Sequence, residues 1–293
     1  YEDADFLLRD GLFNYLVLGM QFSDAANVLG GLNMETSGRT YSDKEKAEVY
    51  VKIAEAYLED GESDAAETFV NKASAVMREV DDRVLQLRYR TTSAQVLDSN
   101  RKFLDAAMRF SELSQTTQAD IDAGDLLVLL GKAVTCAILS KAGPQRNRVL
   151  GTLMKDERLD DMEQIPELAT HAQVLKKMYR EQILRQNDLE AFEATLMTHQ
   201  KATMGDGLTI LERAVVEHNM VAAARVYENV RFEELGNLLE TPPKKAVKVA
   251  ARMISEGRLH GTINQVDGLL SFLGANDELQ NWDERITSIC NKV

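Results

Sequence analysis

The sequence predicts a mainly α-helical fold: a right-handed helical-repeat solenoid of the TPR or HEAT type, followed by a winged helix and a C-terminal helix. Three observations predict it. Only four of the 293 residues are proline, one tripeptide recurs at intervals typical of helical repeats, and a later stretch combines three helical patterns with a hairpin signal. We expect the helical-repeat arm over residues 1–199, the winged helix over 200–274 and the start of the C-terminal helix over 275–293.

The repeat is marked by the tripeptide Asp-Ala-Ala, which begins at Asp24, Asp64 and Asp105. Apolar residues follow each copy closely, so we expect a helix to begin at each tripeptide. Amphipathic segments at 44–58 and 82–97 precede the second and third copies and predict the partner helices. Antiparallel helix pairs that recur at roughly 35 to 45 residues, with alanines where the backbones cross, are typical of a solenoid. A solenoid of this kind usually serves as a protein-binding surface.

Between the repeats and the winged helix, an apolar helix is expected over 120–140, with a break at Gly143-Pro144 and shorter helices after it. The winged helix itself is predicted from the order of its elements. These are a long amphipathic helix at 208–227, an extended link at 230–232, a short helix at 232–240, a third helix, and two strands at 259–264 and 269–273. Thr241 followed by two prolines indicates the start of the third helix, and Gly257 is placed to end it. Asp267-Gly268 is a strong signal for the hairpin turn between the strands.

The third helix should turn an apolar side to the core. Val247, Ala250 or Ala251, and Ile254 recur at steps of three and four residues, which predicts that they are buried.

The opposite side of that helix carries Lys244, Lys248 and Arg252. In a DNA-binding winged helix the same element enters the major groove, so these residues support nucleic-acid binding as an alternative function. The helix has no Asn or Gln to read adenine, and the net charge of the chain is -13. Both facts argue against nucleic acid as a partner.

Composition and charge limit the classes of protein to which this chain can belong. Residues 200–293 hold 11 basic and 13 acidic residues, a net charge of -2, which leaves -11 on residues 1–199. Two cysteines, Cys136 and Cys290, cannot form a disulfide framework, which indicates a reducing compartment. The sequence has no run of eighteen apolar residues, so we expect no membrane partner.

No catalytic or metal-binding motif is recognisable. HExxH, CxxC, GxSxG and phosphate-binding glycine-rich motifs are absent. The four histidines are scattered, whereas a metal site needs three or four converging ligands; they are His171, His199, His218 and His260. We therefore expect structural histidines, no cofactor, no metal and no enzyme activity.

Five segments carry a resemblance to a known family. They are 101–114 (RKFLDAAMRFSELS), 133–158 (AVTCAILSKAGPQRNRVLGTLMKDER), 196–219 (LMTHQKATMGDGLTILERAVVEHN), 232–239 (FEELGNLL) and 253–273 (MISEGRLHGTINQVDGLLSFL). They resemble the PCI-domain family, which is shared by subunits of the COP9 signalosome, the proteasome regulatory lid and translation initiation factor three. Within that family the signalosome is the closer match, and a lid subunit is the alternative.

The resemblance implies a non-catalytic scaffold subunit of the complex that removes the ubiquitin-like Nedd protein from cullins. The implied partners are other PCI-domain subunits, the isopeptidase-bearing subunits and, through the complex, neddylated cullin-RING ligases. In that family the isopeptidase zinc site belongs to another subunit. The implied location is the cytoplasm and nucleus.

Two sets of partner-binding residues follow from the resemblance. Family subunits associate by continuing a sheet from one winged helix to the next, which on this chain implies a sheet edge at Val230, Leu259, Ile263, Leu270 and Phe272. Unpaired edge groups need a cover, so charge or Pro substitutions at Ile263 or Phe272 should break assembly and leave the fold intact. A closed wing that serves only the local core remains the alternative.

The last residues form an amphipathic stripe of Trp282, Ile286, Ile289 and Val293. Such a helix either packs back on its own domain or, as the resemblance implies, joins a bundle made by all the subunits.

Overall fold

The computed structural model describes residues 2–34, 40–116, 122–205 and 207–273. These residues are mainly helical, with one small sheet, as the sequence predicts. The chain divides into two compact units, Tyr1–Cys136 and Ala137–Val293. This division lies inside one helix, well before the predicted domain boundary at residue 199. Several helices expected in the arm therefore belong to the same compact unit as the winged helix.

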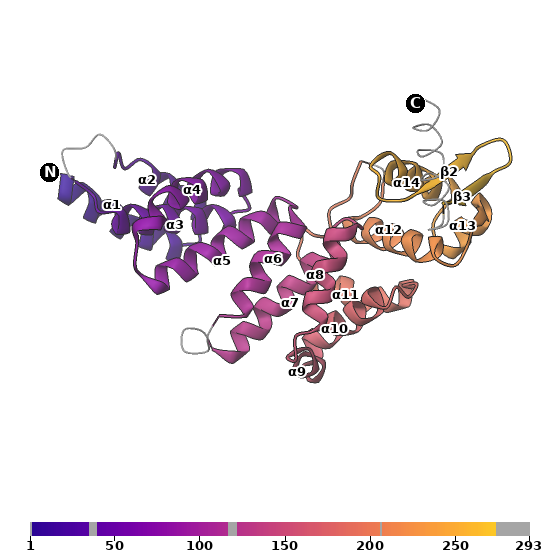
Figure 1. Cartoon of the computed structure of the whole chain (residues 1–293). Coiled ribbons are helices and arrows are strands. Elements are labelled where there is room, and N and C mark those ends of the chain that lie inside the picture. The colour runs from indigo at the N-terminus through magenta and orange to yellow at the C-terminus, as the bar shows by residue number, and fades with distance from the viewer. Residues whose placement is uncertain (1, 35–39, 117–121, 206, 274–293) are drawn as a thin grey trace, which may run out of the picture. The chain divides into compact units, whose positions relative to one another are not determined.

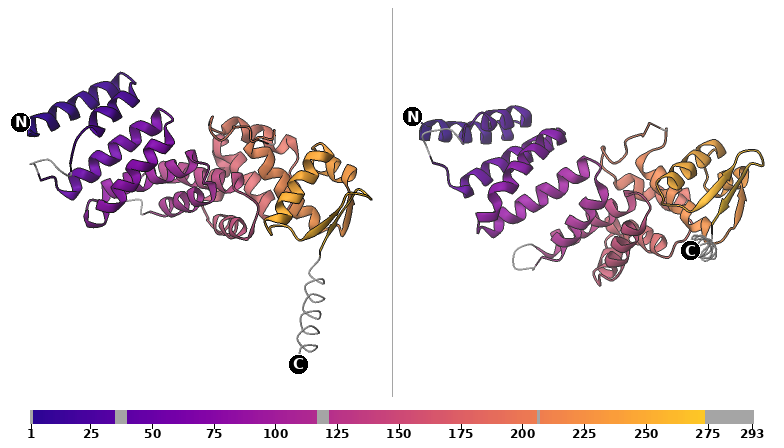
Figure 2. Two further views of the ribbon diagram at one scale, coloured as in Figure 1. Left: turned by 90° about the horizontal axis from the view of Figure 1, so that it is seen from above. Right: turned by 45° about the horizontal axis from the view of Figure 1, so that its top comes forward.

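The first unit is built from paired helices (Figures 1 and 2). They are α1 (Glu2–Leu18), α2 (Phe22–Gly30), α3 (Asp43–Glu59), α4 (Ser63–Val76), η1 (Met77–Glu79), α5 (Arg83–Ser99), α6 (Phe103–Ser114) and most of α7 (Ala123–Leu139). The three Asp-Ala-Ala copies lie in the first turns of α2, α4 and α6, which confirms the predicted helix starts. Their alanines Ala26, Ala66 and Ala107 have no exposed surface, so a side chain larger than methyl would hold the crossing helices apart.

Tight turns join the helices of a pair. Gly61, after α3, has φ = 83°, and Arg101, after α5, has φ = 59°. Both residues end their helix in the left-handed conformation, which is the common way to terminate an α-helix. The start of α3 is also determined locally, because the Ser42 hydroxyl accepts from Glu45 N while the Glu45 carboxylate accepts from Ser42 N. This reciprocal capping satisfies two backbone donors that have no partner within the helix.

The second unit contains the winged helix and the helices before it. Its elements are α8 (Pro144–Met154), α9 (Leu159–Gln164), α10 (Pro166–Tyr179), α11 (Gln186–Thr195), α12 (Ile210–Ala224), β1 (Asn229–Arg231), α13 (Phe232–Leu238), α14 (Pro243–Ser255), β2 (Gly261–Asn264) and β3 (Leu269–Phe272). The predicted order of helices and strands is confirmed. Gly268, with φ = 66°, lies in the hairpin between β2 and β3 and supplies the conformation that the turn needs.

The predicted core face of α14 is confirmed at Ala250, and Ile254 packs at the edge of the core, but the fully buried stripe lies about one residue away from the predicted one. The buried residues are Ala246, Val249, Ala250 and Met253, whereas Val247 and Ile254 are half-buried and Ala251 is exposed. The buried set follows the i, i+3, i+4, i+7 spacing of a helix stripe more completely than the predicted set. Nor does Thr241 cap the helix, because Pro242 occupies the cap position and no side chain caps the first turn.

Candidate assembly site

The sheet of the winged helix has the strand order β1-β3-β2, and both pairs are antiparallel. β3 is therefore the central strand, with partners on both sides. Its residues Leu270 and Phe272 are 1% and 6% exposed and belong to the core of the winged helix. The prediction that they form a sheet edge was wrong, because β1 pairs with the hairpin from outside. For the same reason a charge at Phe272 would disrupt the core instead of leaving the fold intact.

The edges of the sheet are β1 and β2. Phe272 N donates to Glu228 O at 2.8 Å, and Leu273 N donates to His260 O at 3.0 Å. Backbone groups alternate in direction along an antiparallel strand, so these two bonds determine which residues point away from β3. They are Asn229 and Arg231 on β1, and Gly261 and Ile263 on β2. In the described ranges no further strand pairs with these outer groups.

The side chains predicted at the edge lie together, but on the inner face. Val230 and Leu259 are buried and Ile263 is half-buried, and all three pack in the winged-helix core. They position the edge strands, while backbone N–H and C=O groups form the surface that a further strand could join. Whether a partner binds there remains a prediction.

Gly261 allows β2 to approach β3 closely. A Cβ atom at this position would lie 2.6 Å from Ser271 O. Such a distance is far inside van der Waals contact, so any larger residue would push the edge strand outward.

The helix α12 organises this unit through three consecutive buried polar residues, Glu217, His218 and Asn219, which we call the α12 polar triplet. They are 1%, 4% and 2% exposed. Successive helix residues point about 100° apart, so each member meets a different neighbour. Polar groups buried in this way require hydrogen-bond partners, and every member has them.

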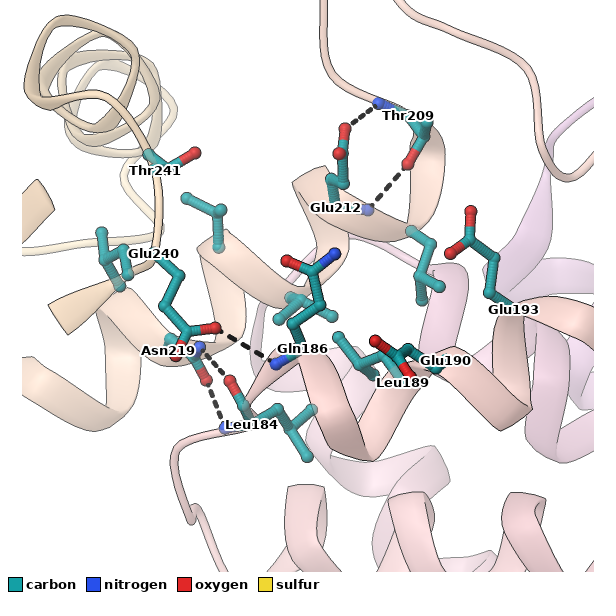
Figure 3. Close-up of a pocket in the computed structure, with 14 residues that line it drawn as sticks. Leu184, Gln186, Leu189, Glu190, Glu193, Thr209, Glu212, Asn219, Glu240 and Thr241 are labelled. Carbon is teal, nitrogen blue, oxygen red and sulfur yellow. Dashed lines mark hydrogen bonds between the residues drawn. The ribbon is translucent and has the colours of Figure 1, made fainter. Parts of the chain in front are cut away.

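Asn219 ties the segment between α10 and α11 to α12. Its Oδ1 accepts from Leu184 N and its Nδ2 donates to Leu184 O, both at 2.9 Å (Figure 3). Two residues further on, Gln186 N donates to the Glu240 carboxylate at 3.1 Å. Glu240 follows α13 and has φ = 51°, so a residue of the winged helix binds the first backbone donor of α11. The helices before the winged helix and the winged helix itself are thereby joined.

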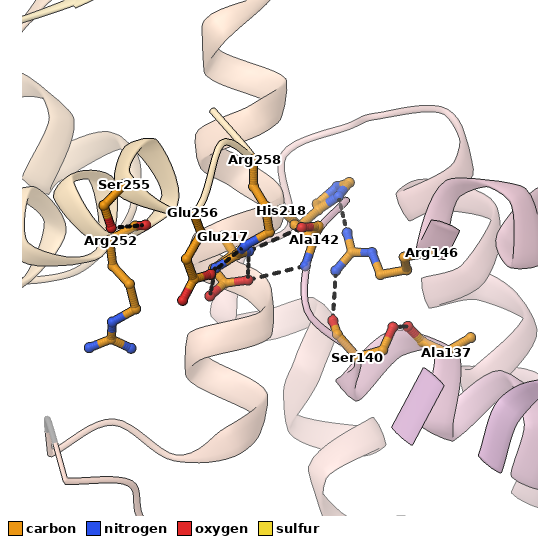
Figure 4. Close-up of polar contacts among 10 residues, drawn as sticks. All are labelled: Ala137, Ser140, Ala142, Arg146, Glu217, His218, Arg252, Ser255, Glu256 and Arg258. Carbon is orange, nitrogen blue, oxygen red and sulfur yellow. Dashed lines mark hydrogen bonds and ion pairs between the residues drawn. The ribbon is translucent and has the colours of Figure 1, made fainter. Parts of the chain in front are cut away.

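Glu217 joins the end of α14 to the segment between α7 and α8 (Figure 4). Its Oε2 accepts from Arg258 Nη1 at 2.6 Å and from Ala142 N at 3.1 Å, and its Oε1 accepts from Arg258 Nη2 at 3.1 Å. Arg258 Nη1 also donates to Ala142 O at 3.0 Å. A bidentate bond between arginine and carboxylate determines direction as well as distance, so the segment that leads from α14 into β2 is held against α12.

His218 contacts a buried arginine. Arg146 Nη2 lies 3.1 Å from His218 Nδ1, and His218 Nε2 lies 3.0 Å from Gln182 O. Since arginine can only donate, Nδ1 accepts and the proton lies on Nε2. Burial, followed by the charge of Arg146, lowers the pKa of His218 to about 4. Burial likewise lowers the pKa of Arg146, to about 10, so at neutral pH the arginine is charged and the histidine is neutral.

The residues of the nucleic-acid alternative lie along one side of α14. Lys244 and Lys248 are exposed and Arg252 is half-buried. This geometry permits contact with an anion but does not test it. The predicted C-terminal stripe, Trp282, Ile286, Ile289 and Val293, lies outside the described residues.

Titratable groups do not converge on a metal site in the described ranges, where no group of three or more His, Cys, Asp or Glu residues has suitable geometry. His171 and His218 are buried, His199 is half-buried and His260 is exposed. None of the helices in the same ranges is long and apolar enough to cross a membrane.

The chain is similar to known proteins along its whole length. A family model described as "PSMD12/CSN4, N-terminal" matches residues 17–122, and the PCI domain matches residues 157–273. The COP9 signalosome complex subunit 4 of Drosophila melanogaster is 43% identical, covering 100% of this chain and 70% of the relative. Its namesake in Arabidopsis thaliana is 40% identical, with 100% and 73% covered, and that in Emericella nidulans is 34% identical, with 100% and 72% covered. The resemblance predicted from the five segments is confirmed.

Proposed function

The chain belongs to the family of COP9 signalosome subunit 4, and from this premise we propose that it is a non-catalytic scaffold subunit of the COP9 signalosome. In this role it supports the deneddylation of cullin-RING ubiquitin ligases by the isopeptidase subunit. The description of its relatives as subunits of a complex and the PCI domain support the proposal.

One structural observation carries the scaffold role: the sheet of the winged helix is bounded by β1 and β2, whose outer backbone groups pair with no further strand in the described ranges. Exposed strand edges promote association unless they are covered or blunted. A further strand can join such an edge through main-chain hydrogen bonds. The α12 polar triplet holds this sheet against the preceding helices of the same unit, so an edge-bound partner would be fixed relative to them.

The proposed direct partners are other PCI-domain subunits and the subunits that carry the isopeptidase. Neddylated cullin-RING ligases would meet the chain through the assembled complex, in the cytoplasm and the nucleus. A proteasome lid subunit is the weaker alternative, because relatives along the whole chain are described as signalosome subunit 4.

The proposal is tested by blocking one sheet edge without disturbing the fold. Arg231 has φ = -70°, which proline adopts without strain, and its N–H points away from β3. Arg231→Pro therefore removes an outward donor and leaves the bonds to β3 in place. Arg231→Ala is the matched control, because it removes the same side chain and keeps the N–H.

Each tagged full-length protein is expressed in its own cells and everything retained on purification is identified. We expect the wild type and Arg231→Ala to retain PCI subunits and the isopeptidase, and Arg231→Pro to lose at least one PCI subunit. A lost edge bond that leaves a buried acceptor unpaired costs about 1–3 kcal/mol, or roughly fivefold to 150-fold in affinity. Retention of lid subunits, or of nucleic acid alone, by the wild type would overturn the proposal.

A further inference from the structure

A groove lies between α11 and α12 and ends at the junction of α13 and α14 (Figure 3). The space between its walls, which is open to solvent and includes part of it, measures about 660 Å³. Two helix stripes form its walls, each with the spacing i, i+3, i+4, i+7 that places side chains on one face. They are Gln186, Leu189, Glu190 and Glu193 on α11, and Glu212, Val215, Val216 and Asn219 on α12.

The floor of the groove is apolar. Six aliphatic side chains line it: Leu184, Leu189, Leu211, Val215, Val216 and Leu239. Five of them are buried in the core of the unit, and Leu189 is half-buried on the α11 side. The floor is therefore held in place by packing and does not depend on a ligand.

The rim of the groove is acidic. Glu190 and Glu193 are exposed on adjacent turns of α11, and in the described ranges no hydrogen bond or ion pair is found for either carboxylate. Glu212 stands opposite at the start of α12, where its carboxylate accepts from Thr209 N at 2.7 Å. No lysine or arginine lines the groove. Arg185 contacts Glu240 at one end, and among the described residues no ion pair is found for the other three glutamates.

An apolar floor below three carboxylates matches one kind of side chain. The methylene groups of arginine or lysine cover apolar surface while the charged head reaches outward, and a guanidinium can bond two carboxylate oxygens at once. We propose that this groove binds a basic segment of a partner protein, which inserts an arginine between α11 and α12. The site is separate from the sheet edges and does not depend on the proposed function. A nucleic acid or an anionic membrane would be repelled by the rim.

The probe is a short fluorescein-labelled Ala/Gln peptide with a central arginine between two lysines, and fluorescence anisotropy at physiological ionic strength, where the Debye length is about 8 Å, measures its binding to the full-length protein. A second peptide carries citrulline, which has the shape of arginine without its charge. The test variant is Glu190→Lys/Glu193→Lys. The control is Glu233→Lys/Glu234→Lys, which makes the same change of net charge at two exposed acids on α13, outside the groove.

We expect roughly tenfold weaker binding of the arginine peptide to the test variant, and a similar loss when citrulline replaces arginine. The control should change binding by less than about twofold, because exposed charges outside the groove contribute little at a distance. The test variant should in turn bind a charge-reversed peptide, in which glutamate replaces the arginine and both lysines, which shows that the groove is still formed. Equal binding of the arginine and citrulline peptides, or equal losses in the test and control variants, would overturn the proposal.

Discussion

Replacing Glu217 with methionine should destabilise the second unit more than any ordinary surface change. The carboxylate is 1% exposed and accepts three hydrogen bonds, two from Arg258 and one from Ala142 N. Glu217→Met leaves the guanidinium and the amide without these acceptors in a dry environment.

The expected loss in free energy of unfolding depends on the contacts that Arg258 keeps in the variant. Removing one partner of a buried ion pair costs about 3–5 kcal/mol. The Arg258 side chain is 13% exposed and keeps its contacts with Glu256 and Ala142 O, so we expect the lower end, about 3 kcal/mol. In a unit of about 150 residues this corresponds to a fall in Tm of roughly 6–12 °C.

Calorimetry of four proteins tests the reasoning: wild type, Glu217→Met, Arg258→Met and the double variant. Because the double variant leaves no unpaired charge, its loss should be smaller than the sum of the single losses by at least about 1 kcal/mol. The transition of the first unit should not move. A loss below about 1 kcal/mol for Glu217→Met, or strictly additive losses, would show that this pair does not hold the wing against α12.

Two further predictions concern the same unit. The pKa of His218 is lower in the folded protein (about 4) than in the unfolded chain (6.5), so the unfolded state binds more protons between these values, and the free energy of unfolding should fall by about 3 kcal/mol as the pH drops from 6.5 to 4. Urea unfolding at a series of pH values measures this fall, and His218→Gln should remove it. A wild-type free energy of unfolding that does not change with pH over this range would contradict the low pKa of His218. Gly261→Ala would place Cβ 2.6 Å from Ser271 O and should lower the free energy of unfolding by about 1–3 kcal/mol through overpacking. Thr262→Ala, at the exposed neighbouring residue, should lower it far less. Equal denaturation midpoints for the two variants would refute the close approach of β2 to β3.

Local signals predicted the elements well. The Asp-Ala-Ala repeat, the long helix α12 and the turn at Gly268 each depend on residues close together in the sequence, and the structure confirms them. The position of β1 does not depend on such signals: a hairpin pattern pairs β2 with β3, but nothing local shows that β1 adds to the free side of β3. The edge was therefore assigned partly to the wrong strand.

The α12 polar triplet was missed for a similar reason. Glu217 and His218 lie on a helix that is buried nearly all round, and their partners are 36 to 75 residues away in the sequence. The amphipathic pattern of this helix predicted a single buried face, which does not account for three consecutive buried polar residues. A cluster of polar residues between Val216 and Met220, flanked by apolar residues on both sides, is the signal that could have indicated buried partners.

The distance between these partners has a consequence for synthesis. Arg146 meets His218 only after a further 72 residues have been made, which at usual rates of translation takes roughly 4 to 14 seconds. During that interval α8, α9 and α10 are made before α12, so the buried Arg146 guanidinium lacks the histidine that it contacts in the folded unit. The same holds for Gln182 O, which accepts from His218. These contacts can form only once α12 has been made.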